Sequence, residues 1–478
     1  MKINHDDNNY YYDFFDYKEE TLSNILRNKD NKILKKEVFN DPIYGYIYFD
    51  YSFLKELINT EVFQRLRRIR QLSCVNIVFG SSEHSRFMHS LGVYELSRRF
   101  LENNHELFKE ERIFGTYEKL LLMTAALLHD IGHGFYSHIF ENIFPNINHV
   151  EMSAKIIQNN VEITSILNKI ENERFQKDLA DIISKKSKNY KFKIIEEILS
   201  SQLDFDRLDY LKRDAFFTGV SYGHIETDRL IRNISIEQNN QKKLQIVHKY
   251  SGIKSIENYI ISRYHMYEQV YNHRKIIGYS VIIEKIFERI FDLIEKKYDF
   301  NFGNILNHLK TIPKDIYSKE VNINNYLKLD DFYANSLIIH LQEENDEILS
   351  NLCKDFLNRK IWNFLDYNSE KDDNFLHENK IEEKEKNYNY YFFLDDPKKS
   401  HFIAYQENQD TKNQDTKCIS IRSADNQIKH LSEESFIIKC FLDEQKNKQN
   451  KKIFYRNDEI KKFLNKKIMI KSKINNEK

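Results

Sequence analysis

Positions 127–134 read Leu-Leu-His-Asp-Ile-Gly-His-Gly and close an apolar run that begins at Leu120. Thr124 is the only polar residue in that run, which therefore predicts a helix buried on all sides. A buried helix that ends in an adjacent imidazole and carboxylate is costly unless those groups bind a partner. We therefore expect a metal ion at His129 and Asp130.

The composition favours a helical protein. The chain has 478 residues, enough for one large domain and a smaller lobe, and contains only 11 glycines and 4 prolines. Its 73 basic and 73 acidic residues balance, so net charge gives no argument for nucleic-acid binding. The four cysteines form no Cys-x-x-Cys pair and are expected to be isolated reduced thiols. No apolar run reaches the length of a membrane span, so we expect a soluble cytoplasmic or nuclear protein.

Two other stretches offer the ligand types that a metal site needs. Residues 85–92 predict a helix with Ser85 as its cap, and Arg86 and His89 share one face of it. Residues 204–214 predict a second helix, whose flank carries Asp206, Arg207, Tyr210 and Asp214. Taken singly, a satisfied helix histidine and a salt-bridged helix are the more ordinary interpretations of these stretches.

The combination is more specific than its parts. His89, His129, Asp130 and Asp206 supply two imidazoles and two carboxylates, a set that suits Fe, Mn, Co, Ni or Zn and lacks the thiolates of structural zinc. A carboxylate can also bridge to Mg²⁺, which normally brings phosphate ligands. Basic groups suited to a polyphosphate surround the set, namely Arg86, His133, His149, Arg207 and Arg263. Metal-activated water attacking phosphorus is the chemistry that this assembly supports.

Several stretches in the same order resemble one known family. They are residues 38–45, 63–67, 70–72, 84–92, 129–141 and 204–214, with Arg263 and residues 271–274. Together they resemble the HD-domain metal-dependent phosphohydrolases, and within them the deoxynucleoside triphosphate triphosphohydrolases. The likeness covers about residues 36–300 and is fainter over 389–445. The likeness is greatest to the mammalian members that carry a sterile alpha motif. We expect no such motif here, because the N-terminal arm is too short to form one.

The resemblance implies a reaction and a role for each residue. Water would attack the α-phosphorus and release a deoxynucleoside and inorganic triphosphate. A transition metal (Fe, Mn or Zn) would bind His89, His129, Asp130 and Asp206, with Mg²⁺ accompanying the phosphates. The catalytic group would be His138, Glu141 and His149, in which His138, oriented by Glu141, protonates the leaving 5′ oxygen. Phosphates would be held by Arg86, His133, His149, Arg207, Tyr210 and Arg263.

The same resemblance implies separate residues that contact the sugar and the base of the nucleotide. Gln71 and Asp214 would read the 3′-hydroxyl, and Leu72 and Tyr271 would crowd the 2′ position and exclude ribonucleotides. Asn272 would lie near the base. The sequence departs from the family in two places near the site, where Val150 separates His149 from Glu151 and Arg207 replaces a lysine.

Regulation is where the sequence departs most. The family's guanine-nucleotide site uses segments matching residues 36–38 and 59–67. In this sequence Asn59 replaces an acidic residue of that site, and Glu37 replaces a basic residue. We therefore expect activation by GTP or a dNTP to be altered or lost. Residues that could still serve a regulatory nucleotide are Val38, Asn59, Gln64, Arg67, Lys249, His273 and Arg274. The family likeness also implies a homo-oligomer, a dimer or tetramer.

The predicted fold is mainly α, an HD-domain helical core with a smaller mixed α/β C-terminal lobe. The expected parts are an arm (1–35), the HD domain (36–365), a polar linker (366–388), the lobe (389–445) and a basic tail (446–478). A long helix is expected over 255–291, strands over 46–49, 390–393, 402–405 and 418–421, and a helix over 431–442. Two alternatives remain open. One is another HD phosphohydrolase, a nucleotidase or cyclic-nucleotide phosphodiesterase; the other is a catalytically silent scaffold that binds nucleic acid through its tail.

Overall fold

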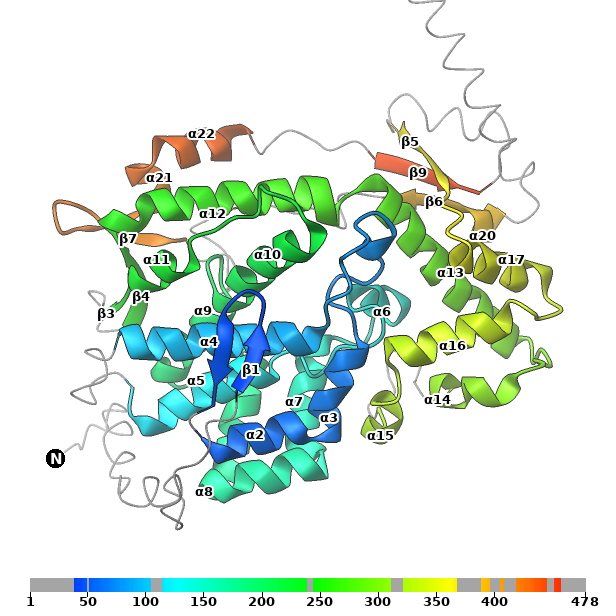
Figure 1. The fold of residues 1–478 in the computed structure, drawn as a ribbon, viewed down its shortest axis with the longest axis horizontal. Helices are drawn as coiled ribbons and strands as arrows, with labels where there is room; N and C mark the ends of the chain where they lie inside the picture. The colour runs from blue at the N-terminus through cyan, green and yellow to red at the C-terminus, as the bar shows by residue number, and fades with distance from the viewer. Residues whose placement is uncertain are drawn as a thin grey trace, which may run out of the picture.

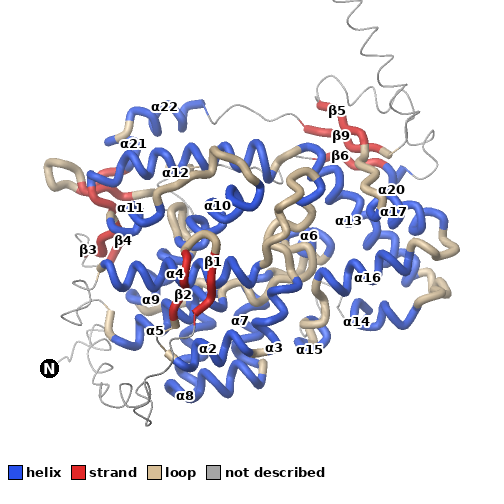
Figure 2. Tube along the Cα trace, viewed as in Figure 1, coloured by secondary structure: helices blue, strands red, loops and turns tan. Residues whose placement is uncertain are grey.

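The computed structural model describes residues 38–49, 51–104, 114–238, 244–310, 321–367, 388–395, 405–407, 418–444 and 451–456. Helices dominate these residues; two of the three small sheets lie at the edges of the helical body, and the two-stranded sheet lies on its front face in this view (Figures 1 and 2). The predicted mainly α class with a smaller mixed lobe is confirmed. None of the helices in the described ranges is both long and apolar enough to cross a membrane.

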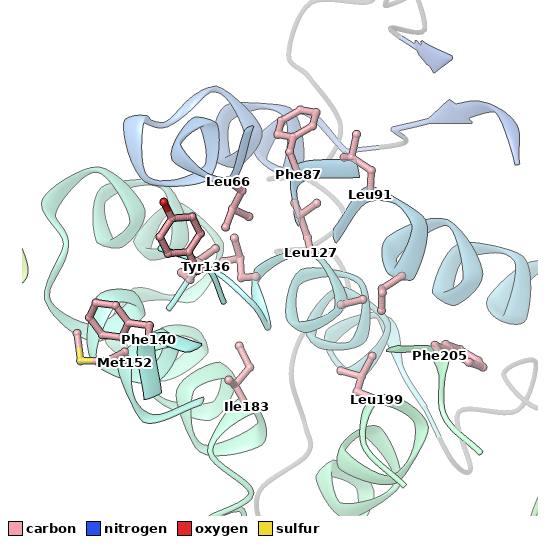
Figure 3. Packing of buried hydrophobic residues seen from close by; sticks show 14 of the residues in the cluster. Leu66, Phe87, Leu91, Leu127, Tyr136, Phe140, Met152, Ile183, Leu199 and Phe205 are labelled. Carbon is pink, nitrogen blue, oxygen red and sulfur yellow. The ribbon is translucent and has the colours of Figure 1, made fainter. Parts of the chain in front are cut away.

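The core forms around α5 (Thr116–Leu128), the apolar run that ends in His129. Residues 120–128 are 0% exposed apart from Met123 at 3%, which confirms a helix buried on all sides. It packs against α4 (Arg86–Asn103), α8 (Val161–Ile183) and α9 (Tyr190–Leu199). Figure 3 shows Leu127 among apolar side chains of this core, with Phe87 and Leu91 from α4 nearby. Each such buried side chain contributes about 1.5–3 kcal/mol relative to an exposed one.

An antiparallel hairpin opens the described chain. β1 (Val38–Asp41) pairs with β2 (Gly45–Tyr48), so the strand predicted over 46–49 is confirmed one residue early. Asp41 Oδ1 closes the turn by accepting the N–H groups of Ile43 (2.8 Å) and Tyr44 (2.9 Å). Next come α2 (Ser52–Asn59) and α3 (Glu61–Arg65), and the Thr60 hydroxyl caps α3.

Ser85 occupies the N-cap position of α4 as predicted, but its side chain makes no capping hydrogen bond. It precedes the helix in an extended conformation because it pairs with Arg70 in an isolated β-bridge. The N–H of Arg86 is bonded to the Ile69 carbonyl at 3.0 Å as part of the same pairing. The start of α4 is thus tied to the loop that carries Gln71.

The long helix expected over 255–291 is interrupted. α12 (Ile253–Met266) runs into a π-helical turn (Tyr267–Tyr271), and α13 (Arg274–Glu295) begins after it. The Asn272 N–H bonds the Tyr267 carbonyl, five residues back, at 2.8 Å, and His273 is extended. Such π turns are frequent at functional sites, and this one carries Tyr271.

The remaining helices surround the site or form the part of the body beside α13 (Figure 1). Those near the site are α6 (His138–Ile143), α7 (His149–Asn159) and α10 (Phe205–Thr218), whereas α11 (Thr227–Arg232) packs against α4 and α12. Those beside α13 are α14 (Asn307–Lys310), α15 (Ile323–Tyr326), α16 (Asp331–Leu341), α17 (Glu347–Leu357) and α20 (Tyr388–Tyr391).

The two larger sheets join segments that are distant in sequence. One has the order β3-β4-β7-β8, from Ile234–Gln238, Leu244–Lys249, Ser420–Arg422 and Ile428–His430. The other has the order β5-β9-β6, from Asn363–Tyr367, Lys451–Tyr455 and Phe392–Asp395. The first sheet lies near the start of α12, and the second lies near the start of α13 (Figure 1).

Predictions for the C-terminal part have mixed outcomes. The expected strands at 390–393 and 418–421 correspond to β6 and β7, each shifted by two residues. The expected helix at 431–442 is split into α21 (Leu431–Glu434) and α22 (Phe436–Glu444). The strand at 402–405 lies outside the described residues except for Tyr405, as do the N-terminal arm and most of the linker. β9, near the start of the basic tail, was not predicted.

Candidate active site and metal centre

Three separate elements bring the four predicted metal ligands together. His89 lies on α4, His129 and Asp130 directly follow α5, and Asp206 lies in the first turn of α10. His89 Nε2 is 3.0 Å from Asp206 Oδ1 and 3.3 Å from His129 Nε2. His129 Nε2 is 3.4 Å from Asp130 Oδ1. An ion bound at about 2.0–2.2 Å holds neighbouring ligand atoms about 3 Å apart, which matches this spacing.

The hydrogen bonds of the two imidazoles test whether the residues fit a metal. His129 Nδ1 lies 2.9 Å from the Ala126 carbonyl, and His89 Nδ1 lies 2.7 Å from Asp209 Oδ2. Because both acceptors require Nδ1–H, the two Nε2 atoms face each other at 3.3 Å and repel unless a proton or a metal cation lies between them. This is the outer-shell pattern of metal-binding histidines. The residues therefore fit a divalent transition metal.

The electrostatics of the site also favour positive charge. Burial acts to lower the pKa of His89, but hydrogen bonds with Asp206 and Asp209 outweigh it and raise the pKa to about 10. Burial acts to raise the pKa of Asp206, yet the His89 hydrogen bond leaves it below its usual value. Carboxylates held ionised around facing imidazoles are what a divalent cation requires.

Sequence reasoning missed the support behind His89. The Arg213 guanidinium binds Asp209 through Nε and Nη2, both at 2.9 Å, and Asp41 Oδ2 of the hairpin through Nη1 at 2.7 Å. All three side chains are 0% exposed. The i, i+4 spacing of Asp209 and Arg213 hinted at this pair, whereas Asp41 is 172 residues away in sequence. The chain Asp41–Arg213–Asp209–His89 connects the hairpin to the metal centre.

One carboxylate holds the two histidines of the predicted catalytic group. Glu141 Oε2 lies 3.1 Å from His138 Nδ1, and Oε1 lies 2.6 Å from His149 Nδ1 and accepts the His149 N–H at 2.9 Å. Burial acts to raise the pKa of Glu141, but its bonds to His138 and His149 lower it below the usual range. An ionised Glu141 thus fixes both rings through Nδ1 and leaves each Nε2 for a ligand. His149 stacks on His133 with ring centres 3.9 Å apart.

A pocket of about 350 Å³ opens beside these groups. Its lining comprises Gln71, Leu72, Arg86, Asp130, His133, His138, His149, Asp206, Arg207, Tyr210, Asp214, Tyr267 and Tyr271. The volume is at the lower end of small-molecule sites, which span about 300–1,000 Å³. Tyr267, on the π turn, is the lining residue that sequence reasoning did not single out. Arg263 and Asn272, both predicted to bind substrate, are absent from the lining, and the Arg263 guanidinium lies 6.0 Å from the Tyr267 ring centre.

The two lining arginines are paired with carboxylates. Arg86 binds Asp130 through Nη1 and donates from Nε to the Ser137 hydroxyl at 2.8 Å. Arg207 Nη1 binds Asp204 Oδ2 at 2.5 Å. Burial acts to lower the pKa of Arg207, but Asp204 raises it above its usual value. Both guanidiniums are therefore fixed in charge and direction before any anion arrives.

The far end of the pocket holds polar groups of a different kind. Asp214 Oδ2 accepts the Tyr271 hydroxyl at 2.7 Å, and Asp214 Oδ1 lies 2.7 Å from His84 Nε2. Burial and the neighbouring Asp214 raise the pKa of Tyr271 well above its usual value, so its hydroxyl stays protonated. Gln71 Oε1 is buried without a hydrogen-bond partner among the described residues. An unsatisfied buried oxygen in a pocket indicates that the ligand carries a hydrogen-bond donor at that position.

The predicted regulatory residues fall into separate places. The Arg67 guanidinium lies 3.5 Å from the Phe87 ring centre and donates to Gln64 at 2.8 Å, and Phe39, next to Val38, contacts the same ring. Asn59 ends α2 and is exposed. By contrast, Lys249 precedes α12 whereas His273 and Arg274 follow the π turn, and a helix as long as α12 spans about 21 Å. One protomer therefore does not bring Lys249 to His273 and Arg274.

Comparison with known proteins agrees with this geometry. The HD domain family matches residues 86–214, which include all four residues of the metal centre. The chain belongs to the HD-domain phosphohydrolases and is a hydrolase by family.

Individual relatives extend the likeness over most of the chain. The uncharacterized protein YwfO of Bacillus subtilis is 34% identical over 437 residues, which are 90% of this chain and 94% of that protein. A deoxynucleoside triphosphate triphosphohydrolase SAMHD1 homolog of Dictyostelium discoideum is 27% identical over 254 residues, 51% of this chain and 47% of that protein. A phosphohydrolase of Bacteroides thetaiotaomicron has a similar structure, with a TM-score of 0.70 and 25% identity, covering 88% of this chain and all of that one.

Proposed function

We propose that this protein hydrolyses deoxynucleoside triphosphates to deoxynucleoside and inorganic triphosphate, and so controls dNTP pools. The observation that carries the proposal is that one pocket is lined both by the metal-centre carboxylates and by the Asp214–Tyr271 pair. A phosphoryl group at the metal centre and a sugar at Asp214 would thus belong to one ligand. The likeness to the Dictyostelium triphosphohydrolase supports the same reading.

The metal centre would set the position of the attacked phosphorus. A bound iron, manganese or zinc ion, with Mg²⁺ on the substrate phosphates, would lower the pKa of a water and polarise the α-phosphoryl oxygens. Around it, Arg86 and Arg207 would hold phosphate oxygens at guanidiniums already aligned by Asp130 and Asp204. Tyr210, His133 and, from outside the lining, Arg263 complete the proposed phosphate contacts.

His138 and His149 would supply the proton for the leaving group and a phosphate contact. His138, held through Nδ1 by Glu141, would donate from Nε2 to the leaving 5′ oxygen. His149, held by the same carboxylate, would bind a phosphate oxygen with its own Nε2. Glu141 remains ionised and holds both rings through Nδ1, so each Nε2 is directed at the ligand.

The opposite end of the pocket would select the sugar. Asp214 would accept the proton of the 3′-hydroxyl, and the Gln71 side-chain amide would donate an N–H to its oxygen. Leu72 and Tyr271 would occupy the space that a 2′-hydroxyl needs. Asn272 would lie toward the base. The π turn that places Tyr271 is the backbone feature on which this selectivity would depend.

We also propose a dimer or tetramer with weak or absent guanine-nucleotide activation. Arg67 and Gln64 are present beside Phe87. At position 59, however, the amide of Asn59 replaces the carboxylate whose two charged oxygens would accept hydrogen bonds from guanine. Lys249 could join His273 and Arg274 at one nucleotide only across a subunit interface.

The test is a substrate panel. Purified protein with Mn²⁺ or Mg²⁺ is given the four dNTPs, the ribonucleotides, nucleoside monophosphates and cyclic nucleotides, with Asp206→Ala as the inactive control. Triphosphate release from dNTPs alone supports the proposal. Turnover of monophosphates or cyclic nucleotides instead would make the protein a nucleotidase or phosphodiesterase, and turnover of none would favour a silent scaffold.

A further inference from the structure

His84 lies at the junction of two segments that form the sugar end of the pocket. It directly precedes Ser85 and α4, in the loop that pairs with residues 69–71. Its side chain is 1% exposed, and it does not line the pocket. A buried imidazole that touches no ligand is either packing or support for a residue that does.

The contacts of His84 identify it as support. Its Nε2 lies 2.7 Å from Asp214 Oδ1, and its backbone carbonyl accepts the Gln71 N–H at 3.0 Å. One residue therefore holds both groups that the proposed function assigns to the 3′-hydroxyl. The two groups come from different parts of the chain, 143 positions apart (214 − 71), and His84 is bonded to each.

The ring itself is held in place from the other side. It stacks on Phe217 of α10, with ring centres 4.5 Å apart and planes 16° apart. The Ser81 hydroxyl donates to the Phe217 carbonyl at 2.5 Å, which fixes the loop to the same turn of α10. Asp214 and Phe217 are one helical turn apart, so His84 bridges one face of α10.

Asp214 shows what this support achieves. As a carboxylate it only accepts, so His84 Nε2–H and the Tyr271 hydroxyl each donate to one of its oxygens. With both oxygens anchored, the plane of the carboxylate is set before a ligand binds. A carboxylate has about four acceptor positions, so two bonds leave room for a ligand hydroxyl.

We propose that His84 is a positioning residue for recognition of the sugar 3′-hydroxyl, acting through Asp214 and Gln71. The inference rests on the proposed dNTP hydrolysis and adds a residue to it. Because the Asp214 carboxylate is already fixed, a ligand hydroxyl binds to it without the free-energy cost of ordering that carboxylate. The contribution of His84 thus exists only for nucleotides that carry a 3′-hydroxyl.

The experiment compares a dNTP with its 2′,3′-dideoxy analogue. In His84→Phe the ring remains for stacking on Phe217 but the donor to Asp214 is lost, whereas His84→Gln retains a side-chain N–H donor. We expect His84→Phe to lower kcat/KM for the dNTP about 10- to 100-fold, the usual effect of a hydrogen bond to a charged group. Turnover of the dideoxy analogue should stay within about threefold, because the lost bond acts only through the 3′-hydroxyl. His84→Gln should recover most of the selectivity.

The outcomes separate the inference from the function on which it rests. An equal loss for both nucleotides would show that His84 serves the fold alone, and no loss for either would show that Asp214 needs no support; both overturn the inference. If His84→Phe fails to fold, His84→Leu, which also removes the donor to Asp214, decides by the same ratio, with metal content and melting temperature as controls. Wild-type protein that releases no triphosphate from any dNTP refutes the proposed function itself.

Discussion

Replacing Gly92 by alanine tests the buried chain behind the metal centre. Gly92 lies inside α4, where alanine normally stabilises a helix by about 1 kcal/mol relative to glycine. Here an added Cβ would lie 1.8 Å from Asp209 Oδ1 and 2.4 Å from Arg213 Nη2. Neither side chain can withdraw into solvent, because both are 0% exposed. The Asp209–Arg213 pair must therefore separate or shift.

The magnitude follows from the opposing contributions. Overpacking by a methyl group costs about 1–3 kcal/mol, and breaking a buried ion pair costs about 3–5 kcal/mol. Partial relaxation and the gain in helix propensity reduce the total. We expect Gly92→Ala to lower the free energy of unfolding by about 2–5 kcal/mol. Because Asp209 orients His89, metal affinity should also fall about 10- to 100-fold.

The assay separates the two effects. Urea denaturation of metal-free protein gives the free energy of unfolding, and competition with a chelator gives metal affinity. Gly80→Ala is the matched control, since nothing lies within 4 Å of its added Cβ, and its stability should stay within about 0.5 kcal/mol of wild type. A Gly92→Ala protein as stable as wild type, with unchanged metal affinity, would refute the reasoning.

Three other predictions concern the pocket, the proton donor and regulation. Leu72→Ala should raise kcat/KM for ribonucleotides relative to deoxynucleotides by about 10-fold or more in a competition assay; an unchanged ratio would remove Leu72 from the selectivity. His138→Asn should lower kcat about 10²–10⁴-fold with metal content unchanged, and a parallel loss of metal would argue against a proton-transfer role. GTP should change initial dNTP turnover by less than about fivefold, the lower end of allosteric coupling, and stronger activation would show that Asn59 suffices.

A further prediction links Glu141 to pH. Its pKa in the folded protein lies below the unfolded value of 4.5, so the bonds it makes stabilise the fold fully above that pH. Stability is then lost as the pH falls through the lowered value. The difference in unfolding free energy between wild type and Glu141→Gln should therefore shrink as the pH falls below 4.5. A difference that stays constant on acidification would contradict this assignment.

The metal centre could be predicted because its chemistry is visible in residue types and order. His129 and Asp130 end an apolar run, and a histidine and an aspartate on predicted helices supply the rest. The outer support could not be predicted in the same way. Asp41 and Arg213 meet across 172 positions, and no periodicity relates a hairpin turn to a distant helix. His84 lies inside residues 84–92, which carry part of the family resemblance, yet its contacts depend on how a loop folds back onto α10.

The errors in secondary structure have similar causes. The π turn at Tyr267–Tyr271 preserves the apolar spacing of a long helix, so the pattern continues where the hydrogen bonding changes. Ser85 is the N-cap residue as predicted, but its side chain makes no capping hydrogen bond and its backbone pairs with Arg70. β9 pairs with β5 and β6, which lie 56 or more positions earlier (451 − 395), and nothing local in its lysine-rich sequence predicts that sheet.

The most direct test of the proposed chemistry uses isotope-labelled water. Hydrolysis of a dNTP in H₂¹⁸O with Mn²⁺ or Mg²⁺ is followed by mass spectrometry of both products. Attack at the α-phosphorus, next to the metal centre and His138, predicts one ¹⁸O atom in inorganic triphosphate and none in the deoxynucleoside. Label in the deoxynucleoside, or products that contain pyrophosphate or orthophosphate in place of triphosphate, would contradict the account.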